Sequence, residues 1–388
     1  MFNEIIQYTC NSFNIYLIFL LILSIIIDLI IGELSPSYHP VILMGKLIDI
    51  LTGKIIKIKN KFSGILLTLT STIIFTLALI VFYGLMLFIT IFLTLFLSIL
   101  FNIITYNYFI INYYVIFRYS IFGILISIFL SSLFSINLLI NSSLNIEKEL
   151  KNNLNSARRS ISMLVSRDTS TLNEESIISA SIESMTENIT DSYVSIVFYY
   201  FLFSLFGLLM GLNYYYIIIL AIFGAMFYRL INTLDAMVGY KNEKLSNIGW
   251  FPAHIDDILN YIPSRIAGFM IILSAYNLKF NWKNSYKIFR RDARNSPSPN
   301  SGFTMAPTAG ALDIQLEKIN VYKIGDKNKD LTVEDITKAV KLTKRSILFS
   351  TLFLILIFFI LSFIIKYNID FSFLNFNNIL NYILMVKL

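Results

Sequence analysis

The stretch "ILLTLTSTIIFTLALIVFYGLMLFITIFLTLFLSIL", from Ile65 to Leu100, contains no Asp, Glu, Lys or Arg. It lies within a longer uncharged run that is bounded by Lys61 and Arg118. A helix of about 20 predominantly apolar residues crosses a bilayer, and this stretch is much longer. It therefore predicts a long or broken membrane-spanning helix, and with it an integral membrane protein.

Composition extends this prediction to the whole chain. The sequence has 388 residues, of which 56% are hydrophobic and 14% are charged, and its mean hydropathy is +0.70. Soluble domains carry about 25% charged residues, so we expect an all-α fold, a polytopic helical bundle that forms one membrane-embedded domain over 1–388. The net charge of +7 fits cytoplasmic loops and an anionic lipid bilayer better than a nucleic-acid partner.

The N-terminal region contains the single cysteine and the first apolar run of the chain. Cys10 is the only cysteine, which excludes an internal disulfide and a zinc site built from cysteines. Glu4 is the only charged residue before the first apolar run, whereas a cleaved signal peptide has a basic n-region. The first span is therefore expected to stay in the protein.

The distribution of charge predicts an orientation in the cell membrane. The loop at 32–64 holds five lysines and two acids, and the positive-inside rule places such a loop in the cytoplasm. The six expected spans are about 15–31, 65–100, 110–140, 193–211, 214–230 and 346–365, with cytoplasmic loops at 32–64, 141–192, 229–257 and 277–345. The segment 256–277 is interrupted by Pro263 and Arg265, so we expect it to be re-entrant or interfacial. The apolar tail at 371–386 is expected to lie on the membrane.

An acidic helix is predicted where one of these spans begins. In "SIESMTENITDSYVSIVFYY", from Ser181 to Tyr200, Glu183, Glu187 and Asp191 are spaced at steps of four. This spacing places them on one helix face, where like charges repel one another. Such a face is either a solvated helix end or a site whose ligand offsets the repulsion, and the uncharged sequence that follows favours a site. Thr171 and Glu174 have the spacing of a capping box that would start this helix.

Other polar segments are expected on the same side of the membrane. Asp256 and Asp257, followed by Asn260, either cap a short helix or contribute to a site. His39 and His254 are far apart in the sequence and predict structural roles rather than a zinc site. The segment "SPSPNSG", at 296–302, is typical of a turn.

The combination of acids and arginines predicts an anionic substrate that binds together with Mg²⁺. The arginines in these segments are Arg158, Arg159, Arg167, Arg229 and Arg265. Mg²⁺ takes oxygen ligands from one or two carboxylates and from substrate phosphates. The sequence contains neither GxxxxGK[ST] nor GxGxxG, so a nucleotide is expected to bind without either of these phosphate-binding motifs.

At these segments the chain resembles the CobD/CbiB family of cobalamin biosynthesis, the adenosylcobinamide-phosphate synthases. The similar pieces occur in family order from 28 to about 342: "HPVILMGKLI", "LVSRDTSTL", "ASIESMTENITDS", "RLINTLDAMVGYKNEKLSNIGW", "DDILNYIPSRIAG" and "SPNSGFTMAPTAGALDIQLEK". The chain departs from the usual family residues at Glu33, Asn295, Met305, Pro307 and Thr308.

The resemblance implies an ATP- and Mg²⁺-dependent amide ligation. The substrates would be adenosylcobyric acid and either aminopropanol or its phosphate, and other cobalamin-assembly enzymes would be partners. The implied catalytic residues are Glu183, Glu187, Asp191, Asp256 and Asp257, of which Glu187, Asp191 and Asp257 would hold the metal. The implied substrate-binding residues are Arg167, Asp168, Asn188, Arg229, Asn232, Asp235, Lys241, Asn260, Arg265, Ser298 and Asn300.

Two other functions remain open at this point. A UbiA-type membrane prenyltransferase would use "ENITD" and the later Asp256–Asp257 pair as two diphosphate-binding motifs, although the first has a single aspartate. A corrinoid or small-metabolite transporter would carry polar groups near the bilayer midplane, often in repeated halves. This chain keeps its charges in loops and shows no repeat.

Overall fold

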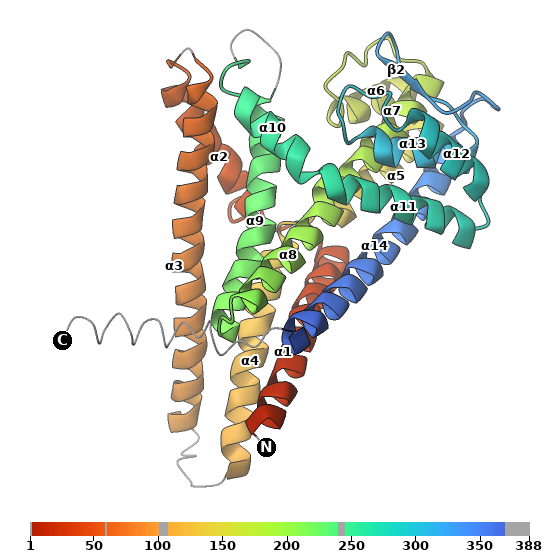
Figure 1. The fold of residues 1–388 in the computed structure, drawn as a ribbon. Coiled ribbons are helices and arrows are strands. Elements are labelled where there is room, and N and C mark those ends of the chain that lie inside the picture. The colour runs from red at the N-terminus through yellow and green to blue at the C-terminus, as the bar shows by residue number, and fades with distance from the viewer. Residues whose placement is uncertain (1, 59, 101–107, 240–244, 369–388) are drawn as a thin grey trace.

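The computed structural model describes residues 2–58, 60–100, 108–239 and 245–368, and most of them are helical (Figure 1). Lys241 and the tail at 371–386 lie outside these ranges. Within these ranges, five helices are long and apolar enough to cross a membrane, or up to seven if each of two bent helix pairs is one span. The prediction of a polytopic helical membrane protein is confirmed.

The five candidate spans come from all parts of the chain. They are Asn14–Ile31 in α1 (Phe2–Ile31), Phe62–Phe96 in α3 (Phe62–Leu100), Glu174–Leu209, α9 (Tyr214–Val238), and Val333–Lys366 in α14 (Val333–Asn368). The segment 65–100 forms one helix, as its uninterrupted apolar sequence predicts.

The region expected as one span at 110–140 lies in a bent helix pair. α4 (Tyr108–Ser131) and α5 (Ile136–Asn152) meet at 41°. The buried carboxylate of Asp28 in α1 accepts a hydrogen bond from the backbone N–H of Asn137, at 3.1 Å. This contact satisfies one of the free amides at the start of α5, so a residue distant in sequence stabilises the new helix start.

The acidic helix and the span after it are one continuous element. α7 (Glu174–Ile189), the π-helical turn η1 (Thr190–Val194) and α8 (Ser195–Leu209) follow one another without a break, so the span expected from 193 begins at Glu174. The N-cap of α7 is Asn173, whose side chain accepts from the backbone of Ser176, and not the expected Thr171. The π turn changes the direction of the side chains that follow it relative to a regular helix.

The segment expected to be re-entrant or interfacial is the second bent pair. α10 (Trp250–Leu259) and α11 (Tyr261–Asn277) meet at 45° around Asn260. Pro263 lies in the first turn of α11, where a helix tolerates proline. Gly268 allows α11 to approach α13 closely, because a Cβ there would lie 2.4 Å from the backbone oxygen of Phe303.

The remaining elements are short and lie near one end of the long helices. They are α2 (Pro40–Ile55), α6 (Leu154–Ser162), α12 (Trp282–Asp292), α13 (Gly302–Leu312), β1 (Leu316–Lys318) and β2 (Tyr322–Ile324). The two strands pair antiparallel, with Glu317 opposite Lys323. We call α6, α12, α13 and this hairpin the polar head; they gather at the upper right of Figure 1. α13 is buried along its whole length.

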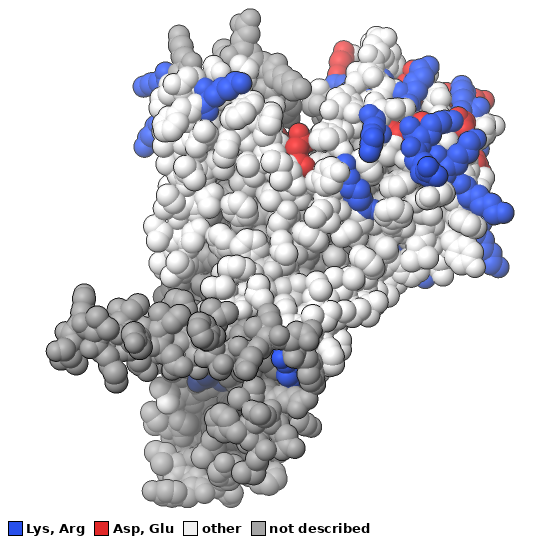
Figure 2. Space-filling model, viewed as in Figure 1, with Lys and Arg blue, Asp and Glu red and all other residues white. Residues whose placement is uncertain are grey.

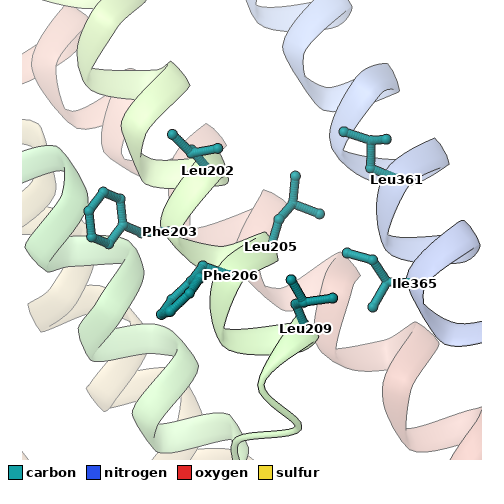
Figure 3. A pocket seen from close by; sticks show the side chains of 7 residues that line it. All are labelled: Leu202, Phe203, Leu205, Phe206, Leu209, Leu361 and Ile365. Carbon is teal, nitrogen blue, oxygen red and sulfur yellow. The ribbon is translucent and has the colours of Figure 1, made fainter. Parts of the chain in front are cut away.

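Away from the polar head, an apolar cavity of about 600 Å³ lies between one part of α8 and the end of α14 (Figure 3). Its lining consists of Leu202, Phe203, Leu205, Phe206, Leu209, Leu361 and Ile365. These side chains carry no hydrogen-bonding or ionisable groups. The cavity is therefore unsuited to acid–base or phosphate chemistry.

Candidate active site

A polar cavity of about 290 Å³ lies between the transmembrane helices and the loop at 293–301, which joins α12 to α13 of the polar head. Its wall is formed by five segments: the end of α7, η1, α9, the α10–α11 junction and the loop at 293–301. Its lining residues are Glu187, Thr190, Asp191, Asp235, Ala253, Asp256, Asp257, Asn260, Pro297, Ser298, Asn300 and Ser301. Figure 2 shows acidic groups in a hollow between the helices on the left and the polar head on the right.

Half of the residues predicted for the site converge on this cavity. They come from segments more than a hundred residues apart: Glu187, Asp191, Asp235, Asp256, Asp257, Asn260, Ser298 and Asn300. Five of these carry carboxylates, so the cavity favours cations over anions. The repulsion expected along the acidic helix face is thus increased by Asp235 of α9 and by Asp256 and Asp257 of α10.

Asn260 holds Asp256 in a defined orientation. Its side-chain oxygen accepts hydrogen bonds from the hydroxyls of Ser195, at 2.6 Å, and Tyr228, at 2.9 Å. The amide is therefore fixed with its NH₂ group towards Asp256, to which it donates at 3.0 Å. Asn232 donates to the other carboxylate oxygen at 3.4 Å. Both oxygens of Asp256 are thus positioned while the residue still lines the cavity.

Arg229 brings a positive charge close to the acidic wall. Its guanidinium donates to the backbone oxygen of Asp191 at 3.4 Å, to Asn232 at 3.3 Å and to the hydroxyl of Ser135 at 3.2 Å. No carboxylate of the described residues lies within ion-pair distance of it, and its buried Nε has no hydrogen-bond partner among them. The charge of Arg229 partly offsets the repulsion between the acids around Asp191.

Arg265 fastens the proline-rich loop to the bent helix pair. Its guanidinium donates to the side-chain oxygen of Asn300 at 2.7 Å and to the backbone oxygen of Pro299 at 3.2 Å. It also stacks on the rings of Tyr261 and Phe303, at 3.7 and 3.8 Å from their centroids. In turn, the Asn300 amide donates to the backbone oxygen of Asp257 at 2.8 Å. The loop "SPSPNSG" is therefore a fixed wall of the cavity.

Glu183, the first acid of the predicted triplet, lies outside the cavity lining. It is 3% exposed and forms an ion pair with Arg167 at 3.0 Å. It also accepts hydrogen bonds from Ser179 at 2.5 Å and from the Tyr322 hydroxyl at 2.7 Å. Burial and the adjacent carboxylate raise the pKa of Tyr322, so this phenol remains a donor. Glu183 and Arg167 therefore join α7 to the hairpin of the polar head.

Two other predicted residues make local contacts instead of lining the cavity. Asp168 is exposed and accepts a hydrogen bond from the backbone of Ser170 at 2.9 Å. Asn188 donates to the backbone oxygen of Ser184, one helical turn earlier, at 2.8 Å. Both contacts stabilise the local backbone.

The histidines are held by neighbouring polar groups. His39 contacts Glu33 at 2.6 Å, and His254 contacts the backbone oxygen of Trp250 at 2.9 Å. Within the described residues, no three or more His, Cys, Asp or Glu side chains are arranged to hold a metal ion. The carboxylates of the cavity lining are oxygen ligands of the kind that Mg²⁺ takes, one or two from the protein together with substrate phosphates.

Tyr228 and Ser195 were not predicted as site residues. Both lie in charge-free, membrane-spanning sequence, and buried tyrosines of that kind occur elsewhere in the bundle, for example Tyr193 and Tyr200. Composition and spacing give no signal that separates them. They became visible only through their shared contact with Asn260.

Comparison with known proteins agrees with the family resemblance seen in the sequence. Residues 21–343 match the family described as CobD/Cbib protein. The chain is 41% identical to the "Probable cobalamin biosynthesis protein CobD" of Methanothermobacter thermautotrophicus, over 86% of this chain and 95% of that protein. It is 38% identical to the protein of the same name from Methanocaldococcus jannaschii, over 80% and 89%. A "Cobalamin biosynthesis protein CobD" from Leptospira interrogans is 41% identical over 54% of this chain and 64% of its own length. No solved structure matches the chain.

Proposed function

The chain belongs to the CobD/Cbib family of cobalamin biosynthesis, and on that premise we propose that it is an ATP-dependent amide ligase. It joins a carboxylate of adenosylcobyric acid to the amine of aminopropanol or aminopropanol phosphate. The observation that supports this proposal is the cavity with five carboxylates, one of them, Asp256, oriented by Asn260. Family membership favours this activity over a prenyltransferase or a transporter.

The reaction needs activation of a carboxylate. Transfer of the terminal phosphoryl group of ATP to the corrinoid carboxylate gives an acyl phosphate and ADP. The amine attacks the acyl carbon, the amide bond forms, and phosphate leaves. Mg²⁺ would neutralise charge on the transferring phosphoryl group. One or two of the predicted ligands Glu187, Asp191 and Asp257 would hold it, and substrate phosphates would supply further oxygen ligands.

The acidic cavity suits the amine substrate. An ammonium group is attracted by the five carboxylates, and it must lose a proton before its nitrogen can attack. Asp256 is held as a hydrogen-bond acceptor by Asn260 and Asn232, so it is the candidate base, with Asp257 beside it. Drug-sized ligands fill pockets of about 300–1,000 Å³. A cavity of about 290 Å³ therefore accommodates the amine and the reacting side arm, with the corrin ring outside.

The cavity would open towards the cytoplasm. The lysine-rich loop at 32–64 supports this orientation through the positive-inside rule. ATP is then available directly, and other enzymes of cobalamin assembly could deliver and receive the corrinoid on the same side.

The proposal predicts product formation in isolated membranes. Membranes containing the protein, supplied with adenosylcobyric acid, Mg-ATP and either aminopropanol or its phosphate, should yield the amide, detected by mass. Membranes without the protein are the control. Product formed without ATP would contradict the ligase mechanism, and absence of product with both amines would contradict the function itself.

A further inference from the structure

The outer face of α12 carries a row of cations. Lys283, Lys287 and Arg290 are exposed and spaced by four and three residues, which places them on one side of the helix. The opposite side, with Ser285 and Ile288, is buried. The row is thus a surface feature that packing within the protein does not require.

No acid among the described residues neutralises these three cations. Within the described residues none of them forms an ion pair, whereas the adjacent Arg291 pairs with Asp292 at 2.7 Å and with Asp326 at 2.8 Å. Helix electrostatics do not explain the row either. A cation stabilises the last turn, where Arg290 lies, but is unfavourable in the first turn, where Lys283 lies.

Aromatic side chains border the row and connect it to an apolar surface. Trp282 and Tyr286 are 40% and 43% exposed, and Trp282 packs edge-on against Tyr276 of α11, with ring centroids 5.8 Å apart. Further along α11, Phe269 and Leu273 are about half exposed. The surface therefore changes from apolar to aromatic to cationic, which is the order of groups across the interface of a bilayer.

We infer that this face binds the anionic headgroups of phospholipids and so holds the polar head against the membrane surface. The face, which we call the basic face of α12, consists of Trp282, Lys283, Tyr286, Lys287 and Arg290. Figure 2 shows Lys and Arg over this flank of the polar head, above a broad band of the molecule that is almost free of charge. Charge complementarity favours an anionic lipid, and the adjoining apolar surface of α11 favours a lipid over a soluble acidic protein.

Tryptophan fluorescence tests this inference directly, because Trp282 is one of only two tryptophans. In a Trp250→Phe background, the full chain is reconstituted in bilayers that contain brominated phosphatidylglycerol or brominated phosphatidylcholine. At low salt the anionic lipid should quench Trp282 with about two- to fivefold higher apparent affinity than the zwitterionic lipid. High salt should reduce this preference, since it screens exposed charges.

Charge-neutralising variants supply the controls. Lys283→Gln, Lys287→Gln and Arg290→Gln combined should abolish the lipid preference, whereas the same number of changes elsewhere in the described chain, at Lys148, Lys323 and Lys327, should preserve it. Equal quenching by the two lipids in the Trp250→Phe protein would overturn the inference and leave a merely solvated face. Absence of quenching by either lipid would also overturn it, because the face would then lie away from the bilayer and be open to a soluble partner.

Discussion

Glu183, Glu187 and Asp191 share one spacing in the sequence but have different environments. The first is enclosed by Arg167 and Tyr322, whereas the other two line the cavity. The spacing predicts a common helix face, and it cannot predict which part of that face the polar head covers. The same limit explains why Tyr228 was not foreseen, since its role depends on the position of Asn260 in another helix.

At this scale we predict that Glu187→Gln and Asp191→Asn each reduce ligation about a hundredfold or more, because each removes a carboxylate that would stabilise charge during phosphoryl transfer. Membrane insertion and thermal stability should be retained, since neutralising one of several adjacent acids relieves repulsion. Ligation is measured by mass in reconstituted bilayers. Glu174→Gln, an exposed acid on the same helix, is the matched control and should have normal activity. Near-normal turnover in both variants would restrict the catalytic acids to Asp235, Asp256 and Asp257.

Helices whose ends depend only on the nearby sequence could be predicted from the sequence. The helix at 65–100 follows from a long uncharged sequence, and the structure forms it without interruption. The break between α4 and α5 depends on Asp28 of α1, which receives a hydrogen bond from Asn137, and the local sequence has neither proline nor glycine to mark it. The π turn that starts at Thr190 also has no sequence signal. The break between α4 and α5 could not be predicted because it depends on a contact with a distant element.

Asp292 connects two elements of the polar head and leads to a prediction on pH. It ends α12 and accepts hydrogen bonds from Arg291 at 2.7 Å and from the backbone N–H of Gly325 at 2.8 Å. Burial raises the pKa of Asp292, but these hydrogen bonds outweigh it and hold the pKa below the ordinary value of 3.8. A depressed folded-state pKa contributes stability above the unfolded-state value, and this contribution is lost as pH falls through the folded-state pKa.

Asp292→Asn should therefore destabilise the protein at pH 7 by about 2 kcal/mol, the usual effect of losing hydrogen bonds to a charged group. The deficit should begin to shrink below about pH 4, where the carboxyl group of the unfolded chain takes up a proton, and it should be lost as the pH falls through the lower folded-state pKa. Thermal unfolding in detergent at several pH values measures this. Asp330→Asn, a largely exposed acid paired with Lys327, should show a much smaller change at every pH. A deficit that stays constant down to pH 3 would mean that the charge of Asp292 is not responsible.

For the whole molecule, the cavity constrains the topology. Its wall includes the acidic end of α7 and the loop at 293–301, so the polar segments on either side of the α8–α9 hairpin must lie on one side of the membrane. α9 has 25 residues and rises about 1.5 Å per residue, which is enough to cross a hydrocarbon core of about 30 Å. The turn between α8 and α9 should then reach the opposite surface. The charge distribution in the sequence predicts the same arrangement of loops. The residues that form the cavity wall give an independent reason for it.

Cysteine labelling tests that topology. In a Cys10→Ser background, Ser170→Cys and Ser298→Cys should react with a membrane-impermeant maleimide only when the cytoplasmic side is accessible. Tyr214→Cys, at the first residue of α9 directly after the turn, should react only from outside. Substrate should protect the cysteine at 298, which lines the cavity, and leave the one at 170, which does not, unprotected. If 170 and 298 were labelled from opposite sides, no cavity could contain both α7 and the proline-rich loop. The acids of α7 and those of α10 would then belong to separate sites, because a shared cavity requires both segments on one face of the bilayer.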